Sequence, residues 1–191
     1  AHFLIKDAEG GPRRPAGPKR RAQSDYYTRL TQRLINAISA RTAQGALYEV
    51  DMRLRPSGQK GPVATRLSSF KSYQAEEAWT WEHMALTRAR VIAGSRTLGA
   101  DVSAAIDIAL RHRRERPKIA HDVIDMRARI AAEKGTSDIW DLKQTRGGLV
   151  DLEFIVQFLE LVTAADKPSA LDTSTIAALQ ALGAAGAKRQ T

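Results

Sequence analysis

The chain has 191 residues, of which 43% are hydrophobic, and it carries a formal net charge of +9 at neutral pH. It contains no cysteine, which excludes both a disulfide framework and a thiolate metal site. There is no run of about 18 apolar residues and no signal-peptide pattern. The sequence therefore predicts a soluble chain located in the cytoplasm, with no membrane partner.

The positive charge invites a nucleic-acid interpretation, but its distribution argues against one. The cations gather at residues 13–21 and 111–118, and neither run has the interleaved aromatic residues that stack on bases. No zinc-finger or RNA-recognition signature is present. We therefore expect nucleic acid not to be the main ligand, whereas ligands that carry phosphate groups remain open.

The N-terminal third of the chain predicts short strands, a loop and one helix. Residues 2–5 form an apolar run typical of a strand, and residues 7–24 are rich in proline and glycine, which indicates an exposed loop. Asp25 is placed to cap a helix whose apolar positions follow the helical period, namely Tyr26, Leu30, Leu34, Ile35 and Ile38. A strand is expected over residues 47–54 and a weaker one over 63–67, joined by a glycine- and proline-rich turn.

From Ser69 onward every segment has helical character. The expected helices span, in chain order, residues 72–92, 101–112, a stretch from Pro117 to a stop at Gly135, 149–165 and 174–182. The helix over 149–165 is apolar on nearly every face, which predicts a central helix packed on several sides. The fold class is α+β and predominantly helical, with a sheet region at residues 1–68 and a helical domain at 69–191.

Asp51 is the first candidate for chemistry. In a strand, Asp51, Arg53 and Arg55 would share a polar face, because successive side chains alternate between faces. One interpretation is a set of surface ion pairs, which contribute little to stability. The other is a metal-binding or proton-accepting carboxylate beside arginines that hold phosphate oxygens. The spacing alone favours neither.

The glycine pair at residues 147–148, before the central helix, is a second candidate. Such a pair leaves backbone N–H groups free at a helix N-terminus, where the helix dipole favours an anion, and Lys143 and Arg146 lie nearby in the sequence. The alternative is an ordinary helix entry in which Asp151 and Glu153 complement the dipole. At least one of these two acids is expected to pair with an arginine.

Four motifs, in this order and spacing, closely resemble one family. They are residues 48–58 (YEVDMRLRPSG), 77–83 (EAWTWEH), 87–91 (TRARV) and 141–154, which contains DLK and GGLVDLEF. The family is the bacterial glutamine synthetase adenylyltransferase, a bifunctional enzyme that adds AMP to glutamine synthetase and removes it. Glu49 and the Val150-Asp151 pair resemble its AMP-adding C-terminal half.

The resemblance implies a polymerase-β-like nucleotidyltransferase sheet, with its C-terminal part at residues 1–68, followed by a helical bundle at 69–191. In that fold three carboxylates bind Mg²⁺ and ATP, and Asp51 matches the third. Asp51 would thus be a metal ligand and the catalytic residue that orients or deprotonates the attacking tyrosine of glutamine synthetase. Contacts to the triphosphate are implied for Arg53, Arg55 and Lys143. The PII signal protein is implied as a regulator.

The sequence departs from the family where the first two carboxylates should be. The Gly-Ser…Asp-x-Asp motif that supplies them is absent, and after residue 182 the chain ends in alanine- and glycine-rich sequence where the family continues. We therefore expect an internal fragment of the transferase half, with little or no activity alone. The alternative function is a non-catalytic, basic helical interaction domain that binds an acidic protein or nucleic acid.

Overall fold

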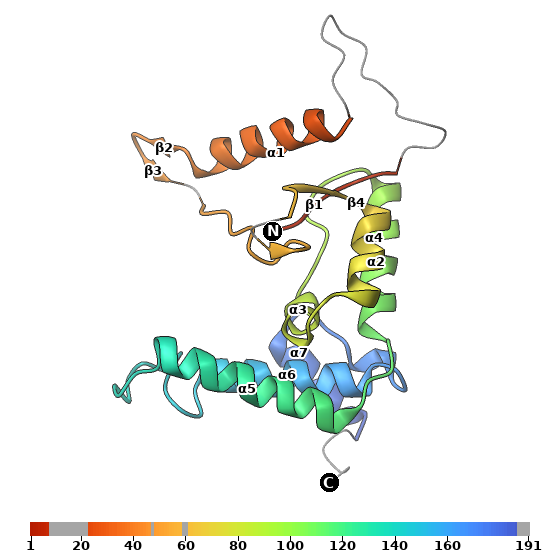
Figure 1. Cartoon of the computed structure of the whole chain (residues 1–191). Helices are drawn as coiled ribbons and strands as arrows, with labels where there is room; N and C mark the ends of the chain where they lie inside the picture. The colour runs from red at the N-terminus through yellow and green to blue at the C-terminus, as the bar shows by residue number, and fades with distance from the viewer. Residues whose placement is uncertain (8–22, 47, 59–60, 187–191) are drawn as a thin grey trace, which may run out of the picture. The chain divides into compact units, whose positions relative to one another are not determined.

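The computed structural model describes residues 1–7, 23–46, 48–58 and 61–186, so most of the loop expected at 7–24 and Leu47 lie outside the described residues. The chain divides into two compact units, residues 1–77 and 78–191 (Figure 1). Helices dominate the described residues and the sheet is small, which confirms the predicted fold class. All four tyrosines lie in the first unit and all three tryptophans in the second.

The first unit is built on two short parallel strands. β1 (Phe3–Ile5) pairs with β4 (Ala64–Arg66), and α1 (Gln23–Ser39) lies between them in the sequence. α2 (Leu67–Glu76) follows β4 directly. The Asp7 carboxylate accepts hydrogen bonds from the hydroxyl of Ser68 and from its backbone N–H, the latter at 3.0 Å. Asp7 thereby supplies an acceptor to the first turn of α2, where backbone N–H groups lack helical partners.

A small hairpin follows α1, and the sequence did not predict it. β2 (Arg41–Thr42) pairs antiparallel with β3 (Gly45–Ala46). Gly45 has a φ of 103°, which glycine adopts without steric cost. The hydroxyl of Thr42 donates to the Gly45 carbonyl at 2.8 Å and closes the turn. The helix before it begins at Gln23, so Asp25 lies in its first turn and is not its cap.

The strand expected over residues 47–54 does not form in its described part, residues 48–54. Residues 48–52 have no regular secondary structure, and residues 53–58 form turns. Ser57 and Gly58 have φ angles of 60° and 54°, which no strand residue adopts. Among the described residues β1 pairs with β4 alone, so this segment has no neighbouring strand to pair with. Alternation of apolar and polar residues cannot by itself produce a strand without such a neighbour.

The single helix expected over 72–92 is two helices, α2 and α3 (Thr80–Leu86). Trp79 is extended, with φ −78° and ψ 159°, and its backbone N–H donates to the Glu82 carboxylate at 2.9 Å. A glutamate at the third helical position that accepts from the residue before the helix is half of a capping box, and it fixes the helix start. The boundary between the two units falls in this break.

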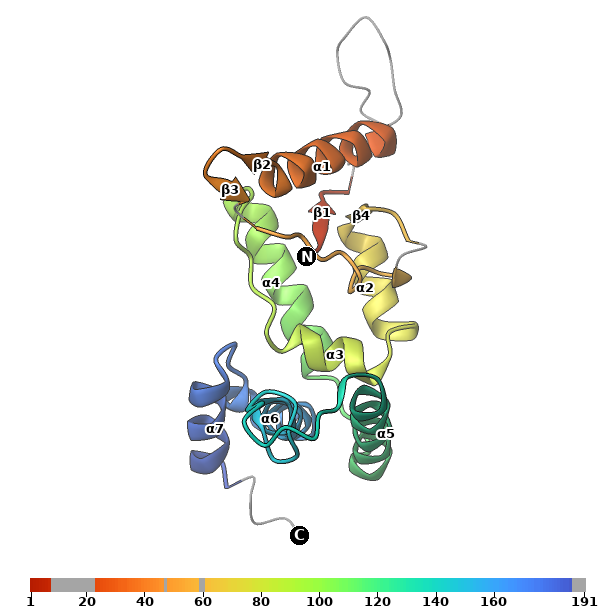
Figure 2. The same ribbon diagram turned by 90° about the vertical axis from the view of Figure 1, so that its left-hand side faces the viewer.

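The second unit is a bundle around one central helix. After α3 come α4 (Arg96–Leu110), α5 (Arg116–Lys134), α6 (Leu149–Thr163), the short 3-10 helix η2 (Pro168–Ala170) and α7 (Thr175–Ala184). α6 lies between α5 and α7 (Figure 2) and also contacts α3 and η2. The prediction of a central helix is therefore confirmed, as is the stop of α5 at Gly135. None of the helices among the described residues combines the length and apolar character needed to cross a membrane.

Two acids are buried in this bundle, Glu82 and Glu160, and Glu160 is the less exposed of the two. Glu160 on α6 is 1% exposed and accepts a hydrogen bond from the backbone N–H of Asp172 at 3.0 Å. Burial raises the pKa of Glu160 to about 7, against the opposing effect of hydrogen bonds from Asp172 and Thr87. The carboxyl group therefore changes charge near neutral pH inside the packed core.

We expect the free energy of unfolding of the second unit to fall as the pH rises from 4.5 to about 7. In this window the folded state binds more protons at Glu160 than the unfolded state, so the contribution of this group to stability is fully present below 4.5 and is lost as the pH rises through the folded pKa of about 7. The loss is at most on the order of 3 kcal/mol. Glu160→Gln keeps the side-chain size without the charge and should flatten this dependence.

Urea unfolding between about pH 5 and about pH 8 measures the effect. Tryptophan fluorescence follows the second unit alone, because Trp79, Trp81 and Trp140 all belong to it. A difference in stability between Glu160→Gln and the parent chain that stays constant with pH would contradict the prediction.

Candidate functional sites

Asp51 lies in the first unit and is paired with Arg53. Its carboxylate accepts hydrogen bonds from the Arg53 backbone N–H at 2.9 Å, from Nε at 2.9 Å and from Nη2 at 2.6 Å. These hydrogen bonds lower the pKa of Asp51 to about 2. The carboxylate is therefore anionic at neutral pH, exposed, and already in contact with a cation. The structure brings Asp51 and Arg53 together through a turn and not through a shared strand face.

Arg55 stabilises the turn that follows through hydrogen bonds from its side chain to two backbone carbonyls. Its Nε donates to the Gly61 carbonyl at 3.0 Å, and its Nη1 donates to the Met52 carbonyl at 3.0 Å. A Cβ at Gly61 would lie 1.9 Å from the Pro56 carbonyl oxygen, so only glycine fits this close approach. Arg55 thus holds together a tight loop around the buried Pro56. Its contact with a triphosphate stays a prediction.

Lys143 belongs to the second unit, whereas Asp51, Arg53 and Arg55 belong to the first. It lies in the turn before α6 with an exposed side chain, and its backbone N–H donates to the Asp141 carboxylate at 3.2 Å. The structure therefore groups three of the four predicted site residues in one loop region. The fourth occupies a different unit.

The carboxylate and imidazole groups near Asp51 decide whether these residues can hold magnesium. Among the described residues, no three or more His, Cys, Asp or Glu side chains gather in a metal-binding arrangement. Asp51 offers one carboxylate, and both of its oxygens accept hydrogen bonds from Arg53. Magnesium takes one or two carboxylates together with water and substrate phosphates. The described residues do not form a magnesium site by themselves.

The turn before α6 supplies acceptors to the backbone N–H groups that one interpretation of the glycine pair left free for an anion. The Gly147 N–H donates to the Asp151 carboxylate at 2.5 Å. The next three N–H groups donate to carbonyls of the same turn: Gly148 to Thr145 at 2.9 Å, Leu149 to Leu142 at 2.9 Å, and Val150 to Lys143 at 3.2 Å. These N–H groups are therefore not free for an anion, and of the two interpretations of the sequence the structure favours the ordinary helix entry.

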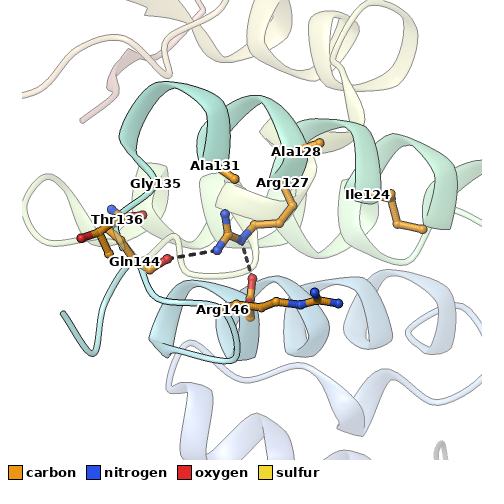
Figure 3. Close-up of a pocket in the computed structure, with 9 residues that line it drawn as sticks. Ile124, Arg127, Ala128, Ala131, Gly135, Thr136, Gln144 and Arg146 are labelled. Atoms are coloured by element: carbon orange, nitrogen blue, oxygen red, sulfur yellow. Dashed lines mark hydrogen bonds and ion pairs between the residues drawn. The ribbon is translucent and has the colours of Figure 1, made fainter. Parts of the chain in front are cut away.

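An ion pair between Arg127 and Asp151 links α5 to α6 (Figure 3). The two side chains are only 18% and 21% exposed, and Arg127 Nη2 also donates to the Gln144 carbonyl at 3.4 Å. The hydrogen bond from Gly147, followed by that from Arg127, holds the pKa of Asp151 below its usual value. Glu153 forms an ion pair with Arg88 at 2.5 Å, so the expectation of an arginine partner is confirmed for both acids.

A pocket of about 610 Å³ opens beside this ion pair (Figure 3). The α5 residues that line it include an apolar strip of Ile124, Ala128 and Ala131. Gly135 and five polar residues complete the lining, and the polar ones are Arg127, Thr136, Gln144, Arg146 and Asp151. The sequence pointed to Arg146, but it could not reveal Arg127, whose place depends on how α5 packs against α6.

The basic run at residues 111–118 is largely engaged within the second unit. Arg114 donates to three backbone carbonyls of α4 and its C-terminal turn, at 2.7 to 2.8 Å. The other partners are Asp107 for Arg111, Asp166 for Arg113, and the Phe158 ring for Arg116. Cations with partners in their own chain are less available to an acidic protein or nucleic acid. The interaction-domain alternative is therefore weakened for this run, whereas the other basic run, residues 13–21, lies outside the described residues.

Gly148→Ala should destabilise the second unit by about 1–3 kcal/mol, as overpacking typically does. A Cβ there would lie 2.6 Å from the Leu142 carbonyl oxygen and 2.8 Å from that of Thr145. Gly183→Ala in α7 is the matched control, because its Cβ would meet nothing within 4 Å. The control should leave stability unchanged or raise it by up to about 1 kcal/mol. Urea unfolding read by tryptophan fluorescence compares them, and equal effects would refute the steric argument.

Arg53→Gln should raise the pKa of Asp51 from about 2 toward its ordinary value of 3.8, because the hydrogen bonds from the guanidinium group, which favour the ionised form, are lost while the one from the backbone N–H remains. NMR titration of the Asp51 carboxyl carbon measures this directly. Arg41→Gln, an equal charge change at an exposed position of β2, serves as the control. An Asp51 pKa that is the same in both variants would show that the pairing is absent in solution.

Comparisons with known proteins identify the family. Residues 4–105 match the family described as glutamate-ammonia ligase adenylyltransferase. The bifunctional glutamine synthetase adenylyltransferase/adenylyl-removing enzyme of Bradyrhizobium diazoefficiens is 55% identical over 163 residues, which cover 85% of this chain and 16% of that relative. The enzyme of the same name from Agrobacterium fabrum is 51% identical over 184 residues, 95% of this chain and 19% of the relative. The chain thus spans less than a fifth of the length of these curated relatives, and it belongs to the glutamate-ammonia ligase adenylyltransferase family.

Proposed function

We propose that this chain is part of an ATP-dependent nucleotidyltransferase that transfers AMP to a tyrosine of glutamine synthetase and so regulates nitrogen assimilation. The observation that carries the proposal is the identity of about half of all residues, over most of this chain, to enzymes named for adenylyl transfer and removal. Glu49 and the Val150-Asp151 pair resemble the AMP-adding half of such enzymes, so the proposal is limited to addition.

Asp51 is the residue to which we assign the chemistry. A carboxylate with a pKa of about 2 stays ionised at neutral pH, as is needed to accept a hydrogen bond from a tyrosine hydroxyl and hold it toward its target. Mg²⁺ and ATP would together supply the electrophilic phosphate. Asp51 would be one of three carboxylates in the complete enzyme, and Arg53, Arg55 and Lys143 remain the proposed triphosphate contacts. Regulation by PII and a cytoplasmic location belong to the same proposal.

A chimera tests the assignment. This chain replaces the matching segment of the Bradyrhizobium diazoefficiens enzyme, and incorporation of labelled AMP into glutamine synthetase is measured with Mg²⁺ and ATP. Asp51→Asn should lower incorporation at least 10²-fold, which is typical for the loss of one electrostatic contributor. Asp25→Asn, the same change at an exposed position of α1, should have no effect.

The 191-residue chain alone should incorporate little or no label, because its described residues provide a single candidate metal carboxylate. Incorporation by the Asp51→Asn chimera at the rate of the unchanged chimera would refute the catalytic role of Asp51. Incorporation by the isolated chain near the chimera's rate would refute the view that the site is incomplete. An unchanged chimera without activity, although folded, would refute the proposed function itself.

A further inference from the structure

The Arg53 guanidinium group and the Asp51 carboxylate form a bidentate pair. Nε donates to Oδ1 at 3.1 Å and to Oδ2 at 2.9 Å, and Nη2 donates to Oδ2 at 2.6 Å. An arginine that binds both oxygens fixes the plane of a carboxylate as well as its distance. The two side chains are 69% and 55% exposed, so packing contributes little to their orientation. The Arg53 side chain is therefore the main constraint on the Asp51 carboxylate.

Arg53 itself lies in a turn whose backbone is hydrogen-bonded. The Met52 carbonyl accepts from the Arg55 N–H at 3.2 Å and from Arg55 Nη1 at 3.0 Å. The Arg53 N–H donates to Asp51 Oδ1 at 2.9 Å, which ties the carboxylate to the same turn. The Ala1 ammonium group, the other cation that acts on Asp51, donates to its backbone carbonyl and not to its carboxylate. The orientation of the carboxylate thus follows from the turn and from Arg53.

Pairing with Arg53 leaves the carboxylate with about one free acceptor site. An ionised carboxylate has about four lone-pair sites. Three donors of Arg53 are bonded to it, namely the backbone N–H, Nε and Nη2. A tyrosine hydroxyl requires one acceptor, within about 2.6–3.2 Å, to be held toward its target. Asp51 therefore offers a single acceptor whose direction is set by Arg53.

We propose that Arg53 is the positioning residue of Asp51, which directs the remaining acceptor of the carboxylate toward the attacking tyrosine hydroxyl. The inference rests on the proposed function, because it concerns the residue assigned to that chemistry. Arg53 carries donors only, so it acts on the reaction through Asp51 and accepts no proton itself. Pairing uses the Nε–Nη2 edge of the guanidinium group, and none of the described residues accepts a hydrogen bond from Nη1. A contact between that second edge and the triphosphate is therefore compatible with positioning.

NMR couplings between Hα and the two Hβ atoms of Asp51 test the positioning in the 191-residue chain, without AMP transfer. The parent chain should show one dominant χ1 rotamer. Arg53→Met keeps the side-chain length without its donors and should give couplings averaged over several rotamers. Arg41→Met, at an exposed position of β2, is the control and should leave the couplings unchanged. Averaging already present in the parent chain would overturn the proposal. A single rotamer that survives Arg53→Met would also overturn it, because the backbone N–H alone would then orient the carboxylate.

The chimera with the Bradyrhizobium diazoefficiens enzyme separates positioning from triphosphate contact. Arg53→Met should lower kcat for AMP incorporation by about 10- to 100-fold, as misplacement of a reacting group does. Arg53→Lys keeps the charge without the planar fork and should recover only part of this loss. In the Asp51→Asn background, Arg53→Met should lower kcat no further, because residues that act as a unit are not additive. Loss of a triphosphate contact would instead raise the KM for ATP in both backgrounds.

Equal losses of kcat from Arg53→Met with and without Asp51→Asn would overturn the positioning role, as would a change confined to the KM for ATP. An Asp51→Asn chimera as active as the unchanged one would refute the proposed chemistry of Asp51 and, with it, the part of Arg53 in transfer. The couplings in the isolated chain still decide in that case whether Arg53 orients the carboxylate. The parent chain is measured without any substitution, so a variant that disturbs folding does not remove the test.

Discussion

The second unit depends on how the N-terminus of α6 is closed. Asp151 in the first turn accepts from Arg127 on α5 and from the Gly147 N–H, and the next three N–H groups return to carbonyls of the preceding turn. This one arrangement supplies acceptors to four consecutive N–H groups at the start of α6, joins two helices and forces the backbone close to Gly148. Removing either charge of a largely buried pair leaves the other without compensation, which typically costs several kcal/mol.

The same closure decides between the two interpretations that the sequence left open for this segment. Two glycines before a helix indicate free N–H groups only if the preceding chain extends away. Here the turn at residues 141–146 folds back over the helix end, and its carbonyls take the place of an external anion. The charged acceptor that the sequence did indicate was Asp151, four residues beyond Gly147. Its arginine partner lies 24 residues earlier, a distance over which no local pattern operates.

Elsewhere, predictions of secondary structure were correct where residues close together in the sequence are enough to determine the element. Pro117 and Gly135 bracket α5, because proline fits a first helical turn and glycine ends a helix without the clash a Cβ would make with the Ala131 carbonyl. The strand over 47–54 failed because a strand requires a hydrogen-bonded neighbour, which alternation does not provide. Asp51 and Arg53, expected to be neighbours on a strand face, are neighbours all the same, because side chains two residues apart also meet in a turn. The helix over 72–92 failed at Trp79 and Glu82, although a glutamate three residues after a possible start was a readable signal.

The separation of aromatic residues between the two units has a spectroscopic consequence. Because every tyrosine lies before residue 78 and every tryptophan after it, excitation absorbed by tyrosine and emitted by tryptophan must pass from one unit to the other. The efficiency of that energy transfer depends steeply on the separation of donor and acceptor. Tyrosine-to-tryptophan energy transfer therefore measures how closely the two units approach each other, and it requires neither a label nor a substitution.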